Sequence, residues 1–213
     1  MSPQNPRMKV MAERRERANI PAYGHDLEEA TFILREAQAA FDIWWLRISK
    51  DGVEEYGQKY ATYPEFFESL AYMALNTFLI NLYKISESNT KTVNFQQLVQ
   101  VAYDSGVISQ AAQHVLDSKR RKVEDLWKKV TVLRHNLIAH RRKGLSRKEV
   151  YEKAKLKADD LRTLMNTNMV VLNLLRKYLN KEREPFDSSS VEQFRHILAR
   201  ASKGISCDGI NGK

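Results

Sequence analysis

The sequence contains little cysteine and no long apolar run, and these shortages exclude several kinds of protein. A single cysteine, Cys207, excludes an internal disulfide bond and any metal cluster held by several cysteines. No apolar stretch approaches the roughly 18 residues that a membrane span needs. The basic N-terminal segment lacks the apolar region of a secretory signal peptide. We therefore expect a soluble, cytoplasmic protein with no membrane partner.

The chain has fewer acidic than basic residues. The 213 residues include 35 Lys and Arg against 26 Asp and Glu, which gives a formal net charge of +9. A basic protein of this kind favours acidic partners, either nucleic acid or an anionic membrane surface. Charge alone does not choose between these partners.

Proline and glycine are scarce, and their spacing predicts an all-α fold. No proline lies between Pro64 and Pro185, and no glycine lies between Gly144 and Gly204. The intervening stretches are rich in good helix formers, and Asp26 with Glu29 has the spacing of a capping box. Apolar residues at helical spacing predict helices at about 26–49, 64–85, 95–103, 109–142, 146–180 and 189–201.

These helices predict a bundle of four to five helices with flexible N- and C-terminal tails. The expected organisation is a basic flexible arm over residues 1–25, a helical bundle over 26–182, a short C-terminal helix over 183–202 and a disordered tail over 203–213. The apolar faces of the helices should supply the core, and the residues expected there include Ile48, Val101, Val115 and Ile197.

Residue patterns typical of several enzyme classes are missing. The five histidines show neither zinc-ligand spacing nor the paired Glu-x-x-His motifs of a di-iron bundle. The chain also lacks a phosphate-binding glycine loop and a Gly-x-Ser-x-Gly elbow. We therefore expect neither a metal nor a cofactor.

One segment concentrates reactive side chains: Arg134, His135, Asn136 and His140 lie within seven residues. This set suits RNA cleavage without a metal, in which the 2′-OH of the substrate attacks the adjacent phosphate. Histidine titrates near neutrality and can move protons, while arginine stays charged and matches phosphate oxygens.

Helix geometry sets a condition on this site. Six residues of a straight α-helix turn by about 600°, or about 240° net, so Arg134 and His140 would not share a face. Asn136 and His140, four residues apart, would share one. The pair converges only if the helix ends or bends near His140, or if a second copy supplies the partner across a two-fold interface.

The segment resembles the signature of the HEPN superfamily, which consists of small all-helical bundles carrying Arg, four to six residues and then His. The form here is most similar to bacterial abortive-infection proteins of the AbiU type, and it reads Leu-Arg-His-Asn-Leu-Ile-Ala-His at residues 133–140. The bundle likeness covers roughly residues 26–182.

The resemblance implies a metal-independent endoribonuclease that acts as a homodimer in phage defence or as a toxin. Arg134 would bind and polarise the scissile phosphate, and His140 would be the general acid/base. His135 and Asn136 would orient the site or the RNA. The resemblance also implies a cognate antitoxin or regulator, although Arg142 stands where many toxin members carry a tyrosine that an antitoxin modifies.

Two other functions stay open at this point. The chain could be a non-catalytic RNA- or nucleotide-binding module, whose cations bind phosphates by counterion release. The candidate RNA-binding cations are Arg141, Arg142, Lys143, Arg147 and Lys148. It could also be a helical protein-interaction scaffold. Cations near a helix C-terminus complement the helix dipole without any function, and His140 could simply cap its helix.

Overall fold

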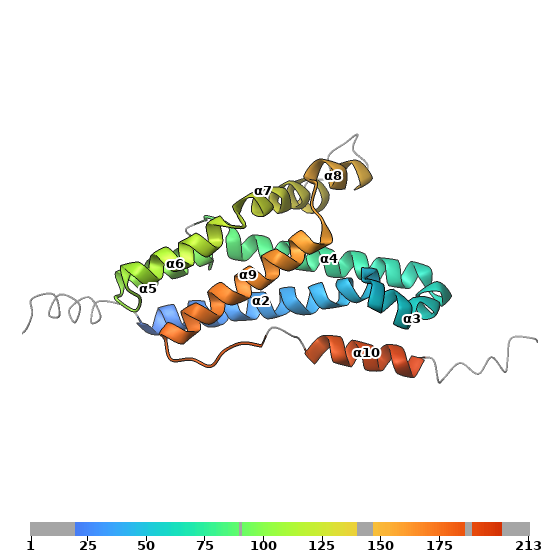
Figure 1. The fold of residues 1–213 in the computed structure, drawn as a ribbon, viewed down its shortest axis with the longest axis horizontal. Coiled ribbons are helices and arrows are strands. Elements are labelled where there is room, and N and C mark those ends of the chain that lie inside the picture. The colour runs from blue at the N-terminus through green and yellow to red at the C-terminus, as the bar shows by residue number, and fades with distance from the viewer. Residues whose placement is uncertain (1–19, 90, 140–146, 186–188, 202–213) are drawn as a thin grey trace, which may run out of the picture. The chain divides into compact units, whose positions relative to one another are not determined.

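The regular secondary structure of the described residues is entirely helical. The computed structural model describes residues 20–89, 91–139, 147–185 and 189–201, and every element in these ranges is a helix (Figure 1). The elements, labelled as in Figure 1, are α2 (Ile20–Ile48), α3 (Lys50–Thr62), α4 (Pro64–Ser86), α5 (Phe95–Asp104), α6 (Gln110–Arg121), α7 (Glu124–Leu133), the π-helix η1 (Arg134–Ala139), α8 (Arg147–Ala154), α9 (Ala158–Tyr178) and α10 (Ser189–Ala201). The predicted all-α class is confirmed, although the described ranges hold more helices than the four to five expected.

The chain divides into two compact units. The first unit takes in the described residues up to Arg35 together with Leu79–Phe186, and the second takes in Glu36–Phe78 and the described residues beyond Asp187. Helices α2 and α4 each supply residues to both units. The predicted extents of the arm, the bundle, the C-terminal helix and the tail stay predictions.

The helix predicted over 109–142 is interrupted after Arg121. Four cations, Lys119 to Lys122, close α6, whereas Glu124 and Asp125 open α7. Cations are favourable at a helix C-terminus and carboxylates at an N-terminus, so each of the two short helices has charges that match its dipole. Val123 between them has φ −113° and ψ 11°, outside the helical region. The prediction of one continuous helix is therefore wrong at this point.

The helix predicted over 146–180 is also interrupted. Lys155 adopts a left-handed conformation with φ 48°, which ends α8. The Asp160 carboxylate accepts a hydrogen bond from the Lys157 backbone N–H at 2.9 Å, which satisfies a free donor at the start of α9. The chain therefore re-enters a helix within three residues of leaving it.

The first helix begins earlier than its capping pattern predicts. Helix α2 starts at Ile20, six residues before Asp26, and the side chain of Tyr23 is only 2% exposed. Burial of this aromatic ring draws the preceding turn into the helix, and tertiary packing therefore overrides the capping signal. Burial also raises the pKa of the Tyr23 hydroxyl well above its ordinary value.

Helix α3 lies between the helices predicted over 26–49 and 64–85, where no helix is predicted. The helix begins after Ser49, whose hydroxyl accepts a hydrogen bond from the Gly52 backbone N–H at 3.2 Å. A Cβ atom at position 52 would lie 1.8 Å from the carbonyl oxygen of Leu46. Glycine thus allows the close approach of two backbone segments rather than ending a helix.

A buried ion network joins three segments of the first unit. The Glu184 carboxylate, 4% exposed, accepts hydrogen bonds from Arg35 on α2 at 2.8 and 2.9 Å. It also pairs with Arg176 on α9 at 3.1 Å. The Asn173 side chain bonds both backbone groups of Glu184, at 2.7 and 3.0 Å. These contacts fix the segment after α9 against α2 and α9.

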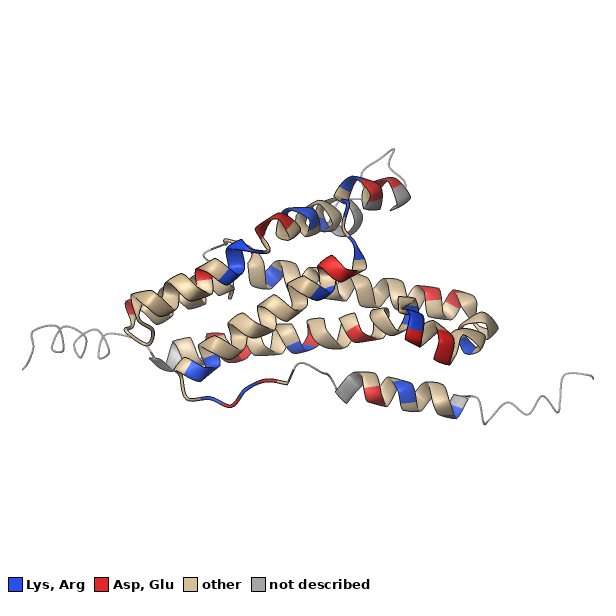
Figure 2. Cartoon of the chain, in the orientation of Figure 1, with Lys and Arg blue, Asp and Glu red and all other residues tan. Residues whose placement is uncertain are grey.

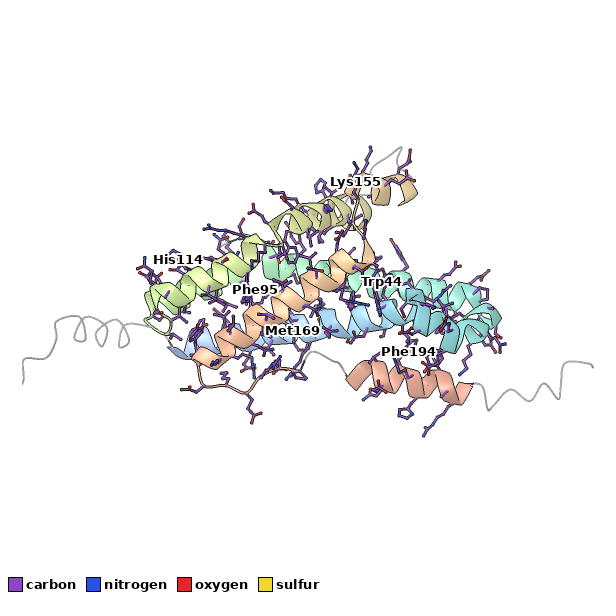
Figure 3. The ribbon with its side chains drawn as sticks, in the orientation of Figure 1. Trp44, Phe95, His114, Lys155, Met169 and Phe194 are labelled. Carbon is purple, nitrogen blue, oxygen red and sulfur yellow. The ribbon has the colours of Figure 1, made fainter. Side chains whose placement is uncertain are left out.

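The second unit has a small apolar core that includes α10. Tyr60 on α3 contacts Phe67 on α4 edge to face, with ring centroids 5.0 Å apart. Leu198 on α10 is buried in the same cluster, and Lys59 donates a hydrogen bond to its carbonyl at 2.8 Å. Phe194 on α10, labelled in Figure 3, packs partly buried against this cluster. The C-terminal helix is thus anchored to α3 and α4 inside this unit.

Four apolar residues expected in the core are exposed instead. The exposed fractions are 42% for Ile48, 42% for Val101, 49% for Val115 and 64% for Ile197. The buried residues of α6 are Ala112 and Leu116, which lie four residues apart. The buried apolar face of α6 therefore passes beside Val115 and does not include it.

Candidate functional site

Arg134 stands at the junction of α7 and η1, and its side chain is held by an aromatic ring. The guanidinium carbon lies 4.3 Å from the centroid of the Tyr83 ring on α4. Both residues belong to the first unit, and both are half-buried. A cation at this distance from an aromatic face is attracted by the ring quadrupole, which restricts the positions that the guanidinium adopts. Within the part of the chain that the structure describes, no hydrogen-bond acceptor pairs with this guanidinium.

The predicted motif adopts a π-helix rather than an α-helix. Element η1 spans Arg134–Ala139, the six motif residues that precede His140. A π-helix has i→i+5 hydrogen bonds and therefore a wider turn, and such turns occur frequently at functional sites. The segment that begins at Arg134 therefore does not have the straight α-helical geometry for which a separation of about 240° from His140 was calculated.

The Asn136 side chain supports the start of this wider turn. Its Nδ2 donates a hydrogen bond to the Val132 carbonyl oxygen at 2.7 Å. The bond ties η1 to the last turn of α7 and occupies one of the two amide protons. His135 beside it is exposed. The structure therefore brings Arg134, His135 and Asn136 together on one turn, while their predicted roles in catalysis stay predictions.

Most of the other predicted site residues lie outside the described residues. His140, Arg141, Arg142 and Lys143 fall in the gap between η1 and α8. Arg147 and Lys148 open α8, with only their backbone described. Helix α8 packs against both α7 and η1, so the backbone of these two cations lies on a helix adjoining the π-helix.

A second group of cations lies at the end of α6. The run Lys119-Arg120-Arg121-Lys122 closes this helix, and Figure 2 shows Lys and Arg gathered there. The run is visible in the sequence as four successive cations, but the sequence analysis above does not single it out. Its significance comes from the cavity beside it, which no local pattern indicates.

This cavity, of about 440 Å³, is formed by the first unit alone and is called the α6 cavity below. Its wall includes Arg120 from α6, Trp127 from α7, Asn168 from α9 and Phe95 from the start of α5. Figure 3 labels Phe95. Ser86, the last residue of α4, also lines it. Ser86 follows Tyr83 by three residues, so their backbone positions are separated by a rise of about 4.5 Å along the axis of α4.

The Arg120 side chain is an incompletely paired cation in a partly desolvated place. Its side chain is 26% exposed, and its Nη1 lies 3.4 Å from the Asp117 carboxylate, a long distance for a charged pair. Burial lowers the pKa of the guanidinium, against the opposing effect of Asp117. The charge of an anion bound in the cavity would offset the cost of this desolvation.

The described residues contain neither a candidate metal centre nor a candidate membrane span. Within the described ranges, no three His, Cys, Asp or Glu side chains gather in a way that could hold a metal ion. None of the described helices is long and apolar enough to cross a membrane.

Comparisons of this chain with protein-family models, with curated proteins and with solved structures found no match.

Proposed function

We propose that this chain is a metal-independent endoribonuclease of the HEPN type, acting in the cytoplasm in phage defence or as a toxin. The observation that carries the proposal is the position of Arg134. Its guanidinium rests on the Tyr83 ring at the first residue of a π-helix that coincides with the motif. A fixed cation without a carboxylate partner among the described residues suits a phosphate whose charge grows in the transition state.

The reaction needs two proton movements and one charged group. The 2′-oxygen attacks the adjacent phosphorus, the bond from phosphorus to the 5′-oxygen breaks, and the products carry a 2′,3′-cyclic phosphate and a 5′-OH. Arg134 stabilises the non-bridging phosphate oxygens. His140 takes the 2′-OH proton or delivers one to the leaving 5′-oxygen, and His140 of a second copy performs the other transfer in a homodimer. His135 and Asn136 orient the RNA and the turn.

The charge of the chain supports an RNA substrate. The net charge is +9, and cations close α6 and open α8 on either side of the motif. Phosphate contacts of this kind give salt-dependent binding that does not depend on base sequence. The same cations favour the second candidate function, an RNA-binding module that does not cleave.

The test is cleavage of a labelled single-stranded RNA by the purified full chain in EDTA. Arg134→Ala should lower the rate by about 10²–10³ and His140→Ala by about 10²–10⁴. Lys50→Gln is the matched control, because it removes one positive charge from an exposed ion pair with Glu54. Circular dichroism and thermal melting confirm that each variant folds.

Further measurements distinguish the endoribonuclease from the RNA-binding module that does not cleave. An RNA with a 2′-deoxy substitution at the scissile nucleotide should resist cleavage, since the attacking oxygen is missing. Loss of cleavage in EDTA, or an unchanged rate for His140→Ala, would contradict the proposed mechanism. RNA binding that falls steeply with salt, without any cleavage by the parent, would instead favour the binding module.

A further inference from the structure

We propose that the α6 cavity binds a nucleotide, with its phosphate at the end of α6 and its base between Trp127 and Asn168. The proposal concerns binding and does not require that the chain cleave RNA. A nucleotide can reach this cavity as a free mononucleotide or as one unit of a single-stranded RNA, and the experiment below distinguishes these sources.

The size and lining of the cavity suit a nucleotide. Its volume of about 440 Å³ falls in the usual range of ligand pockets, roughly 300–1,000 Å³. Trp127, which is half-buried, supplies aromatic surface, and the side chains of Gln100 and Gln113 supply amide donors and acceptors. Stacking on an aromatic ring combined with hydrogen bonds to the base edge is how proteins hold unstacked bases.

The cations beside the aromatic wall of the cavity can bind the phosphate of the nucleotide. Arg120 and Arg121 both line the cavity, and the only described hydrogen bond of the Arg120 guanidinium is the 3.4 Å contact with Asp117. Beside it, a second hollow of about 450 Å³ shares Asp117 and Arg121 and adds His114 and Lys122. Positive charge is therefore concentrated on the side of the cavity that α6 forms. We expect the phosphate to bind on this side, and the base to lie near α7 and α9.

Asn168 points independently to a polar ligand in the cavity. The residue is 2% exposed, and its Nδ2 is buried without a hydrogen-bond partner among the described residues. A buried donor left unpaired is unfavourable, and an acceptor on a ligand would satisfy it. Its terminal torsion is broad, so a modest rotation presents the amide to an acceptor in the cavity. Carbonyl oxygens and ring nitrogens of a nucleobase are such acceptors.

The carboxylates of the cavity favour a base over a bare anion. Asp117 and Glu124 lie in the wall with Arg120 and Arg121, so the formal charges of these four side chains cancel. A phosphate ion would meet repulsion as well as attraction there. A nucleotide instead offers exocyclic amino and ribose hydroxyl donors to the carboxylates and a phosphate to the arginines.

The experiment is isothermal titration of the full chain with AMP, UMP, adenosine and inorganic phosphate, and with a five-nucleotide 2′-O-methyl RNA. The methylated RNA cannot be cleaved through its 2′-oxygens, so binding is read independently of the proposed nuclease. We expect AMP or the RNA to bind, and adenosine and phosphate each to bind at least about tenfold more weakly, which corresponds to about 1.4 kcal/mol. Binding of the RNA alone would assign the site to an RNA strand, and binding of AMP would assign it to a free nucleotide.

Two variants localise the site. Arg120→Gln and Asn168→Leu should each weaken binding about tenfold or more, whereas Lys50→Gln should leave it unchanged. Asn168→Leu should also keep or raise the melting temperature, since it replaces an unpaired buried polar group with an apolar one of similar size. Loss of stability in Asn168→Leu with unchanged binding would assign Asn168 a structural role and overturn the proposal. Absence of binding to any nucleotide or RNA probe, or binding of phosphate as tight as that of AMP, would also overturn it.

Discussion

The guanidinium carbon of Arg134 lies 4.3 Å from the centre of the Tyr83 ring, so a residue of α4 positions the cation of the predicted motif. Replacing Tyr83 with leucine should remove the cation–π attraction, worth about 1 kcal/mol, and lower kcat for RNA cleavage about fivefold. Tyr83→Phe keeps the aromatic face and should retain the parental rate. Single-turnover cleavage measures both variants.

The conservative variant makes this a test of positioning rather than of general stability. NMR relaxation of the Arg134 Nε–H group gives a readout apart from activity, with higher mobility expected in Tyr83→Leu only. Equal mobility in Tyr83→Leu, Tyr83→Phe and the parent would show that the ring does not restrain Arg134.

The buried carboxylate of Glu184 should be among the most sensitive positions of the first unit. Glu184→Ala leaves Arg176, itself 7% exposed, with the 3.4 Å contact to Glu28 as its remaining ion pair, and should lower the free energy of unfolding by about 3 kcal/mol. Arg35→Ala removes a partner whose side chain is 64% exposed, and should cost about 1 kcal/mol or less. Urea denaturation of the two variants measures the difference, and equal losses would contradict the network as described.

Local signals in the sequence account for much of the fold but not for its interruptions. Pro64 begins α4, and Asn94 and Ser109 accept capping hydrogen bonds at 3.0 and 3.2 Å where helices are predicted to start. These residues act within one turn, so a sequence pattern is enough to place them. The left-handed turn at Lys155 carries no glycine, so the usual sequence signal for such a turn is not present there.

The candidate site, like the fold, is only partly predictable from local sequence patterns. Arg134 and its neighbours form a contiguous motif, so they are found from spacing, whereas Tyr83 lies about fifty residues earlier and is brought to Arg134 only by the fold. The α6 cavity draws on four separate helices and the end of α4. Its one visible sequence signal is the cation run of 119–122, which also fits an ordinary helix C-terminus.

Gly52 and Gly57 on α3 should respond in opposite directions to substitution by alanine. A Cβ at Gly52 would lie 1.8 Å from the Leu46 carbonyl oxygen, which is backbone and cannot turn aside. Gly52→Ala should therefore destabilise the second unit by about 2 kcal/mol or more. At Gly57 the nearest atom is a Val53 methyl group at 3.7 Å, and alanine there should stabilise the helix by about 0.5–1 kcal/mol. Thermal melting compares the two, and a stable Gly52→Ala protein would contradict the close approach.

Tyr56 in the core of the second unit should make the protein sensitive to alkali. Burial raises the pKa of its hydroxyl to about 12, from about 10 in the unfolded chain, and neighbouring Glu55 adds to the rise. The contribution to stability is complete below pH 10 and is lost as the pH rises from 10 towards 12, because the unfolded chain ionises first. Urea midpoints at pH 8 and pH 11 measure this loss. Tyr56→Phe should show a smaller fall between the two pH values than the parent, whereas Tyr63→Phe, at an exposed position, should fall as the parent does.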